Sequence, residues 1–147
     1  MKFIKKYRSP NFDNRNNKKI RFIIIHYTAI GNYMDALLYL KDKKNKVSSH
    51  FLICQSGKIF NLVDEKKRAW HAGASYWNGE TDLNSISIGI ELDFSFSKVN
   101  NEYSLKMIHS LLKLINFLKK KYKIDVNNIL GHSDISPYRK IDPGKKF

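Results

Sequence analysis

Side chains able to do chemistry gather near the carboxyl end of the chain. The final seventeen residues, GHSDISPYRKIDPGKKF, combine one histidine, two aspartates and four basic side chains. His132 follows a short apolar stretch, and Asp142 comes ten residues later. Because Pro137 lies between them and Pro143 follows Asp142, a rigid, turning loop can fold the carboxylate back towards the imidazole. The spacing indicates that these two side chains belong to one site.

A second histidine stands where a buried strand is expected to end. His26 closes the apolar, β-branched run IRFIIIH, and the pattern turns polar directly after it. Sites in open sheets gather at strand ends. Two imidazoles and one carboxylate, from His26, His132 and Asp142, form a ligand set that Zn²⁺ accepts in catalytic sites. The sequence contains no H-E-x-x-H helix, so such a site has to be assembled from distant segments.

Glu91 is the candidate general base. It is a lone carboxylate among the apolar residues of IGIEL. Burial there would raise its pKa towards the range that suits proton transfer. The alternative interpretation is a glutamate on the solvated face of an edge strand.

The other candidates carry weaker signals. His109 lies within a helical pattern and is interpreted as a helix-edge side chain, whereas His50 opens a strand and could be structural or support a neighbouring site. Cys54 is the single cysteine, so no internal disulfide is possible, which fits a reducing compartment. Its apolar neighbours favour a buried hydrophobic residue over a nucleophile.

Strands and helices alternate along the chain, as in α/β proteins. Residues 1–19 are expected to be an irregular N-terminal segment of a single domain, 1–147. The pattern predicts one central mixed β-sheet flanked by helices, with the longest helix packed on it. The expected strands are 20–26, two strands within 50–63 that meet at Ser56-Gly57, 85–92 and 127–132, and the expected helices are 33–42 and 103–123.

Composition sets limits on partners and location. A net charge of +14 suggests an anionic partner, although scattered lysines can equally reflect coding bias. No nucleic-acid-binding motif is present, so no nucleic-acid partner is expected.

No apolar run is long enough to cross a bilayer, and the N-terminus lacks the apolar core of a secretion signal. We therefore expect a cytoplasmic protein, or a periplasmic one whose leader is absent from this sequence.

Six ordered motifs resemble those of one enzyme family. They are FIIIHYT, VSSHFLI, KRAWHAG, SIGIEL, LGHSDISP and RKIDPGKKF. The chain is similar over nearly its whole length to zinc-dependent N-acetylmuramoyl-L-alanine amidases, a family that includes phage lysozyme-type amidases and peptidoglycan recognition proteins. The segments WNGETDLNSISIGIE and GHSDISPYRKIDPG resemble its AmpD-like and AmiD-like bacterial branch most closely.

This resemblance implies a role for each matching position. The family's zinc ligands, one Zn²⁺ per chain, correspond to His26, His132 and Asp142, and its water-activating glutamate corresponds to Glu91. The lysine that stabilises the oxyanion corresponds to Lys140. The expected contacts with the substrate are His71 at the cleft, Tyr27 as a cleft wall, Arg139 and Trp77.

The resemblance also implies a function and leaves alternatives open. It implies a hydrolase of peptidoglycan or of muropeptides in cell-wall recycling. We expect the protein to be a monomer. The alternative is a non-catalytic recognition protein that binds peptidoglycan. The sequence departs from the family where it has IELDF, so Asp93 and Phe94 are expected to alter the rim of the cleft.

Overall fold

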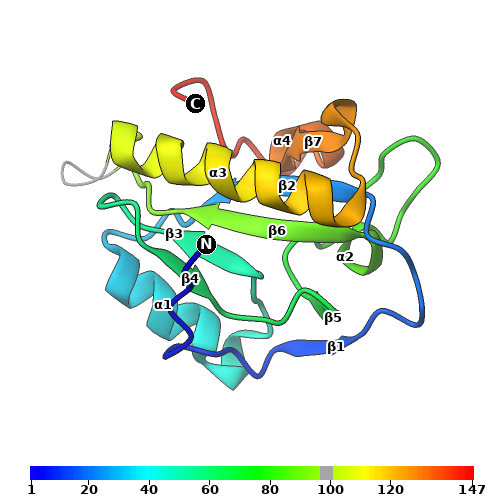
Figure 1. The fold of residues 1–147 in the computed structure, drawn as a ribbon, viewed down its shortest axis with the longest axis horizontal. Coiled ribbons are helices and arrows are strands. Elements are labelled where there is room, and N and C mark those ends of the chain that lie inside the picture. Colours follow the sequence, from blue (N-terminus) through cyan, green and yellow to red (C-terminus); the bar gives the residue numbers. More distant parts are fainter. Residues whose placement is uncertain (97–100) are drawn as a thin grey trace.

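The computed structural model describes residues 1–96 and 101–147, and it is built around a five-stranded mixed sheet (Figure 1). The strand order is β4-β3-β6-β2-β7, in which β4 is antiparallel to β3 and the other neighbours run parallel. The expected mixed sheet is thus confirmed. Its strands are β2 (Phe22–Tyr27), β3 (Phe51–Ile53), β4 (Ile59–Asn61), β6 (Ser87–Leu92) and β7 (Ile129–Gly131).

The two six-residue strands, β2 and β6, form the centre of the sheet. Their sequences, FIIIHY and SIGIEL, are apolar almost throughout, as expected for parallel strands buried on both faces. The parallel register pairs His26 with Glu91, and it pairs Ile25 with Gly131 of β7. His132 directly follows Gly131 in the chain. The candidate site residues His26, Glu91 and His132 therefore lie together near the carboxyl ends of these parallel strands.

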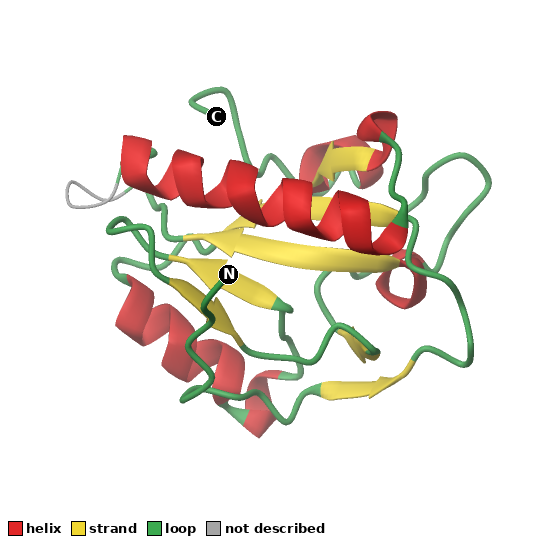
Figure 2. Ribbon diagram, in the orientation of Figure 1, coloured by secondary structure: helices red, strands yellow, loops and turns green. Residues whose placement is uncertain are grey.

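Two helices cover opposite faces of this sheet. The long helix α3 (Leu105–Tyr122) lies across one face, as Figure 2 shows in red over yellow strands. Ser104 caps its N-terminus, and the Ser104 side chain accepts a hydrogen bond from the Met107 amide. Helix α1 (Tyr33–Lys41) instead packs with Leu52 and other residues whose side chains point to the opposite face.

The N-terminal segment is more ordered than the sequence indicated. The structure pairs β1 (Phe12–Asn14) with β5 (Lys67–Ala69), and it bridges Ile4 to Phe60. The expectation of an irregular segment was wrong at these points. Residues of β1 are all exposed, so they lack the alternation that marks a strand.

Four short helical segments were also missed, because three or four residues cannot show a helical period. They join the longer elements near their ends. They are the 3₁₀ helices η1 (Lys43–Asn45) and η2 (Val126–Asn128) and the α-helices α2 (Leu83–Ile86) and α4 (His132–Ile135).

Within the described part of the chain, no helix has both the length and the apolar character needed to cross a membrane.

The placement of α3 on the sheet can be tested through its buried side chains. Leu114 is fully buried between α3 and the sheet, whereas Leu112 on the same helix is 54% exposed. We expect Leu114→Ala to lower the free energy of unfolding by about 2–5 kcal/mol, because it leaves a cavity. The control, Leu112→Ala, should change it by less than about 1 kcal/mol. Urea denaturation measures both, and equal losses would contradict this placement of α3.

Candidate metal centre

Three side chains from separate segments converge at the carboxyl end of β2. His26 is the fifth residue of β2, His132 begins α4 directly after β7, and Asp142 lies in the C-terminal loop. The Nδ1 atoms of the two histidines are 2.9 Å apart. Asp142 Oδ2 lies 3.2 Å from His26 Nδ1 and 3.1 Å from His132 Nδ1. All three side chains are buried, and their ligand-type atoms lie within 4.8 Å of one another.

Backbone hydrogen bonds hold the loop that carries Asp142. The Ser133 amide donates to the Asp142 carbonyl at 2.9 Å, which ties the loop to α4. The Lys140 amide donates to the Ser136 carbonyl at 2.9 Å, forming a turn between the two segments. The structure thus brings Asp142 back to His132, as the two prolines indicated.

Hydrogen bonds in the side chains fix which nitrogen of His26 carries a proton. The Ser87 hydroxyl donates its one hydrogen to the Leu83 carbonyl at 2.6 Å. It must therefore accept from His71 Nε2–H, which is 3.2 Å away. His71 Nδ1 is then an acceptor, and it receives His26 Nε2–H at 3.0 Å. This chain leaves a lone pair on His26 Nδ1.

A backbone carbonyl fixes the tautomer of His132 in the same way. Its Nε2–H donates to the Ala72 carbonyl at 3.0 Å, so its Nδ1 atom also presents a lone pair. Two imidazole lone pairs and the Asp142 carboxylate therefore face one another with no proton between the nitrogens. A cation is what satisfies three such acceptors, so the residues present fit a metal ion.

Electrostatics favour the protonation states that ligation requires. Burial is the main reason that the pKa of His26 falls to about 4, so the imidazole is neutral near pH 7. Burial alone would raise the pKa of Asp142. The neighbouring His132 and His26 side chains outweigh that effect and hold the pKa of Asp142 well below its usual range. Neutral imidazoles and an ionised carboxylate are the forms that bind metal.

Glu91 lies beside His26 on the neighbouring strand. Its Oε2 atom is shielded from solvent and has no hydrogen-bond partner among the described residues. Burial is the main cause that raises its pKa well above the usual value, and the negative charge of Asp142 adds to the effect. The charge of Lys140 opposes the shift. A carboxylate whose pKa is raised by its surroundings is a candidate for proton transfer.

The convergence opens into a cleft of about 460 Å³. Tyr27 lines it, and its ring centroid lies 5.3 Å from that of Phe94. Lys140 and Arg139 also line it. The Arg139 guanidinium, however, donates to the carbonyls of Ala72 (2.8 Å) and Ala74 (2.9 Å). Arg139 therefore holds the neighbouring loop in place, and its predicted contact with a substrate stays a prediction.

His71 lines the cleft, as the resemblance implies, whereas Trp77 lies outside it. Trp77 lies in an adjacent hollow that also contains Tyr138 and Arg139. His71 is 6% exposed, and both ring nitrogens are engaged, by His26 and Ser87. These contacts favour a role for His71 in orienting His26 over direct substrate binding.

Gly89 makes room for this arrangement. A Cβ atom built at Gly89 would lie 2.5 Å from His71 Cγ, so only glycine admits the ring there. His50 lies alongside, accepting from the Gly89 amide at 3.0 Å through Nδ1. Of the two open interpretations of His50, this contact supports a structural role. His109 is exposed on α3, as expected.

The expected rim residues are not at the rim. Asp93 and Phe94 are each 1% exposed, so the expectation that they form the edge of the cleft was wrong. Phe94 stacks on Tyr103, with ring centroids 4.6 Å apart. Cys54 is a buried free thiol, as predicted.

Sequence reasoning did not find the residues that support the ligands. Ser87 and the carbonyl of Ala72 fix the tautomers, but neither belongs to a recognisable spacing with His26 or His132. The one available signal was polar Ser87 at the start of an apolar strand. A backbone carbonyl gives no signal in a sequence.

Fold and site together define a class: single-domain α/β proteins with a candidate two-histidine, one-aspartate metal centre beside a partly buried glutamate. Residues 16–145 match the family model of N-acetylmuramoyl-L-alanine amidases, and the chain belongs to this family. The resemblance of the six motifs is thereby confirmed.

Curated relatives agree with this assignment. The chain is 39% identical over 158 residues to the 1,6-anhydro-N-acetylmuramyl-L-alanine amidase AmpD of Haemophilus influenzae, covering 95% of this chain and 84% of that protein. It is also 39% identical over 142 residues to the N-acetylmuramoyl-L-alanine amidase AmiD of Escherichia coli. That match covers 88% of this chain and 50% of AmiD, so the chain spans about half of that relative.

Solved structures share the fold. A crystal structure of an AmpD derivative superimposes with a TM-score of 0.83 at 31% identity, covering all of this chain and 90% of that one. A complex of E. coli AmiD with anhydro-N-acetylmuramic acid-L-Ala-D-γ-Glu-L-Lys gives a TM-score of 0.80 at 36% identity, covering 92% and 55%. The expected α/β fold of this family is confirmed.

The hydrogen-bond chain behind His26 can be tested through metal affinity. We expect His71→Leu to weaken Zn²⁺ binding by about 10–100-fold, because His26 Nε2–H loses its acceptor and the ring its orientation. Asn offers an oxygen near the position of Nδ1, so His71→Asn should weaken binding less. Competition with a chromophoric chelator measures the dissociation constants. His109→Leu is the exposed control, and wild-type affinity in His71→Leu would refute the orienting role.

The raised pKa of Glu91 predicts a pH dependence of stability. In the metal-free protein the folded state holds this proton to higher pH than the unfolded chain, whose value is near 4.5. The contribution of Glu91 to the free energy of unfolding is therefore fully present below about pH 4.5 and is lost as the pH rises above it. We expect Glu91→Gln to gain stability relative to wild type between about pH 4.5 and pH 8.

Urea denaturation in the presence of a chelator measures this difference. The matched control is Glu102→Gln, at an exposed position. If Glu91→Gln differed from wild type by the same amount at both pH values, the raised pKa of Glu91 would be contradicted.

Proposed function

We propose that the protein is a zinc-dependent hydrolase that cleaves the amide bond between N-acetylmuramic acid, or its 1,6-anhydro form, and L-alanine. The observation that carries the proposal is the convergence of three ligand atoms, from His26, His132 and Asp142, beside the shielded Oε2 atom of Glu91. Membership of the amidase family and the names of the AmpD and AmiD relatives support the choice of substrate.

His26, His132 and Asp142 would hold the zinc ion, one per chain. When bound, Zn²⁺ supplies Lewis-acid activation of water and of the scissile carbonyl. The lone pairs on both Nδ1 atoms and the ionised carboxylate are the donors that this ion prefers.

Glu91 would move the proton. It takes a proton from the attacking water and passes it to the amide nitrogen, so that the peptide leaves as a neutral amine. Its raised pKa supports both steps, because the group is basic enough to accept the proton and acidic enough to return it.

Lys140 and the cleft walls would act on the substrate. Lys140 lines the cleft, and its charge is felt by both Glu91 and His26, so it lies where a developing oxyanion can be stabilised. Tyr27 supplies an aromatic wall for the substrate. We assign Trp77 and Arg139 to an outer part of the binding region, since they share the adjacent hollow.

The likeness to AmpD supports soluble anhydro-muropeptides as the substrate and a role in cell-wall recycling. A cytoplasmic location and a monomeric state, both expected from the sequence, remain predictions.

The test is cleavage of a soluble anhydro-muropeptide, followed by mass spectrometry. We expect release of the free stem peptide, loss of release with a chelator, and recovery with added Zn²⁺. Glu91→Gln should bind Zn²⁺ like wild type but lose turnover by about 10²–10⁴-fold, because proton transfer is removed. Glu102→Gln should retain activity.

Two results would contradict the proposal. Wild-type turnover in Glu91→Gln would remove Glu91 from the mechanism. A zinc-loaded protein that binds the muropeptide, yet cleaves neither it nor intact sacculi, would favour the non-catalytic recognition protein.

A further inference from the structure

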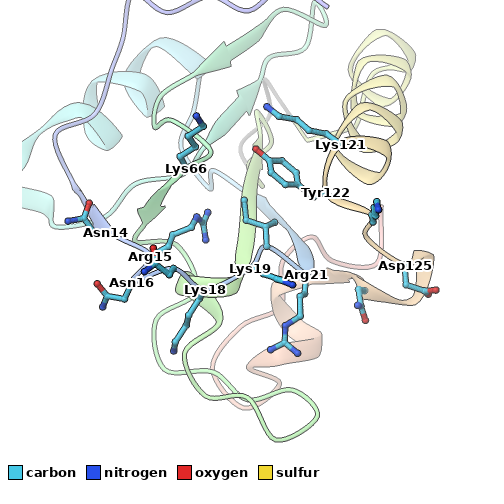
Figure 3. Close-up of a pocket in the computed structure, with 14 residues that line it drawn as sticks. Asn14, Arg15, Asn16, Lys18, Lys19, Arg21, Lys66, Lys121, Tyr122 and Asp125 are labelled. Carbon is cyan, nitrogen blue, oxygen red and sulfur yellow. The ribbon is translucent and has the colours of Figure 1, made fainter.

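A second groove lies away from the metal centre. It has a volume of about 1060 Å³, more than twice that of the cleft at His26. The segment before β2, the loop before β5 and the C-terminal end of α3 form it, as the labelled side chains of Figure 3 show. This is the amino end of β2, and His26 is near the carboxyl end. Five strand residues, from Arg21 to His26, separate the two places by about 16 Å.

The groove is strongly basic. Seven of its fourteen lining residues are lysine or arginine, and one, Asp125, is acidic. The remainder includes four asparagines, whose amide groups can donate hydrogen bonds. The seven basic residues are Arg15, Lys18, Lys19, Arg21, Lys66, Lys121 and Lys123.

Three of these cations already have carboxylate partners outside the groove. Lys18 pairs with Asp82 at 3.2 Å, Arg21 pairs with Glu80, and Lys121 pairs with Glu65 at 2.6 Å. These pairs reduce the positive charge of the groove, but they leave the remaining four basic residues without an ion pair in the described structure.

Arg15 is a buried cation on the floor of the groove. It is 6% exposed, and its guanidinium donates to the carbonyls of Glu65 (3.0 Å), Asn84 (3.1 Å), Ser85 (2.8 Å) and Ser87 (2.8 Å). Carbonyl dipoles thus hold the charge without a directly paired carboxylate. Its donors are therefore used inside the protein, and Arg15 contributes to the groove through its positive charge and not through a free hydrogen-bond donor.

The other three cations are free to bind a ligand. Lys19, Lys66 and Lys123 are exposed, and they form no ion pair or side-chain hydrogen bond with the described residues. They come from three different segments, so they surround the groove instead of following one helix face. A ligand that contacts all three must carry several anionic groups along its length.

We propose that this groove is a binding site for a linear phosphodiester polymer. Ammonium groups act as point charges that suit phosphate oxygens, with neighbouring asparagine amides as further donors. Planar carboxylates are best matched by the fork of a free arginine, and both groove arginines are already engaged. The backbone phosphates alone are recognised, which agrees with the absence of a motif that reads bases.

A polymer bound there leaves the metal centre open. The two sites lie at opposite ends of β2, so the protein can hold an anionic polymer and act on a second molecule at the cleft. This binding does not depend on the proposed hydrolysis, and each can fail without the other.

The test is fluorescence anisotropy with a labelled poly(glycerol phosphate) chain and the full-length protein. If three phosphates are neutralised, the dissociation constant should rise about 20-fold between about 50 and 200 mM NaCl. The triple variant Lys19→Gln, Lys66→Gln, Lys123→Gln should weaken binding at low salt by at least about 10-fold and flatten the salt dependence. Cleavage of soluble muropeptides should be unchanged in this variant, because none of the three lines the cleft.

The matched control removes three exposed lysines elsewhere, as Lys2→Gln, Lys5→Gln and Lys113→Gln, which gives the same net charge. It should weaken binding by less than about 3-fold. Equal weakening in both triple variants would overturn the groove and assign binding to the overall charge. Equally tight binding of poly-glutamate would overturn the phosphate chemistry.

A single-stranded oligonucleotide with the same number of phosphates distinguishes the source of the polymer. Binding equal to that of the glycerol phosphate chain supports recognition of the phosphate backbone alone. Binding more than about 10-fold tighter than that chain would overturn backbone-only recognition, since the bases would then contribute.

Discussion

The site depends on the lateral register of three parallel strands. Strand β6 places Glu91 opposite His26 of β2, and β7 delivers His132 one residue beyond Gly131. A slip of one residue in either pairing would turn the side chain to the other face of the sheet. The apolar residues of β2 and β6, buried on both faces, fix that register, so the core that stabilises the fold also positions the candidate metal ligands and the carboxylate.

A second layer of polar groups then determines the chemical state of the ligands. Ser87, His71 and His26 form a chain of hydrogen bonds. Because the Ser87 hydroxyl donates to a carbonyl, this chain leaves the lone pair of His26 on Nδ1, which faces the candidate metal position. The Ala72 carbonyl does the same for His132. These groups sit in a buried region where an unsatisfied donor is costly, so the tautomers are set by the structure and not by the solvent.

The two ends of the central strands carry different kinds of side chain. The carboxyl ends gather histidines and carboxylates in a cleft, and the amino ends gather lysines around a wider groove. Part of the positive charge, which on sequence grounds could be coding bias, is gathered at this groove, where seven of the 27 lysines and arginines lie. The proposed binding of a phosphodiester polymer gives this concentration a function separate from hydrolysis.

The sequence by itself determined the long elements and the identity of the metal-site candidates. Apolar β-branched runs predicted β2 and β6, a three-four periodicity predicted α3, and the spacing of His132, Pro137 and Asp142 indicated a loop that folds back. These signals are local, because each depends on neighbours in the chain. The resemblance to the amidase family supplied the role proposed for Lys140, and it agreed with the role as general base that the sequence had already indicated for Glu91.

Only the tertiary structure decided what depends on contacts between distant residues. The short strands β1 and β5 pair across more than fifty residues and have no alternation of their own. His71 supports His26, and Phe94 is buried away from the cleft rim, because packing and not sequence position fixes their neighbours. The basic groove likewise joins three segments that nothing in the sequence connects.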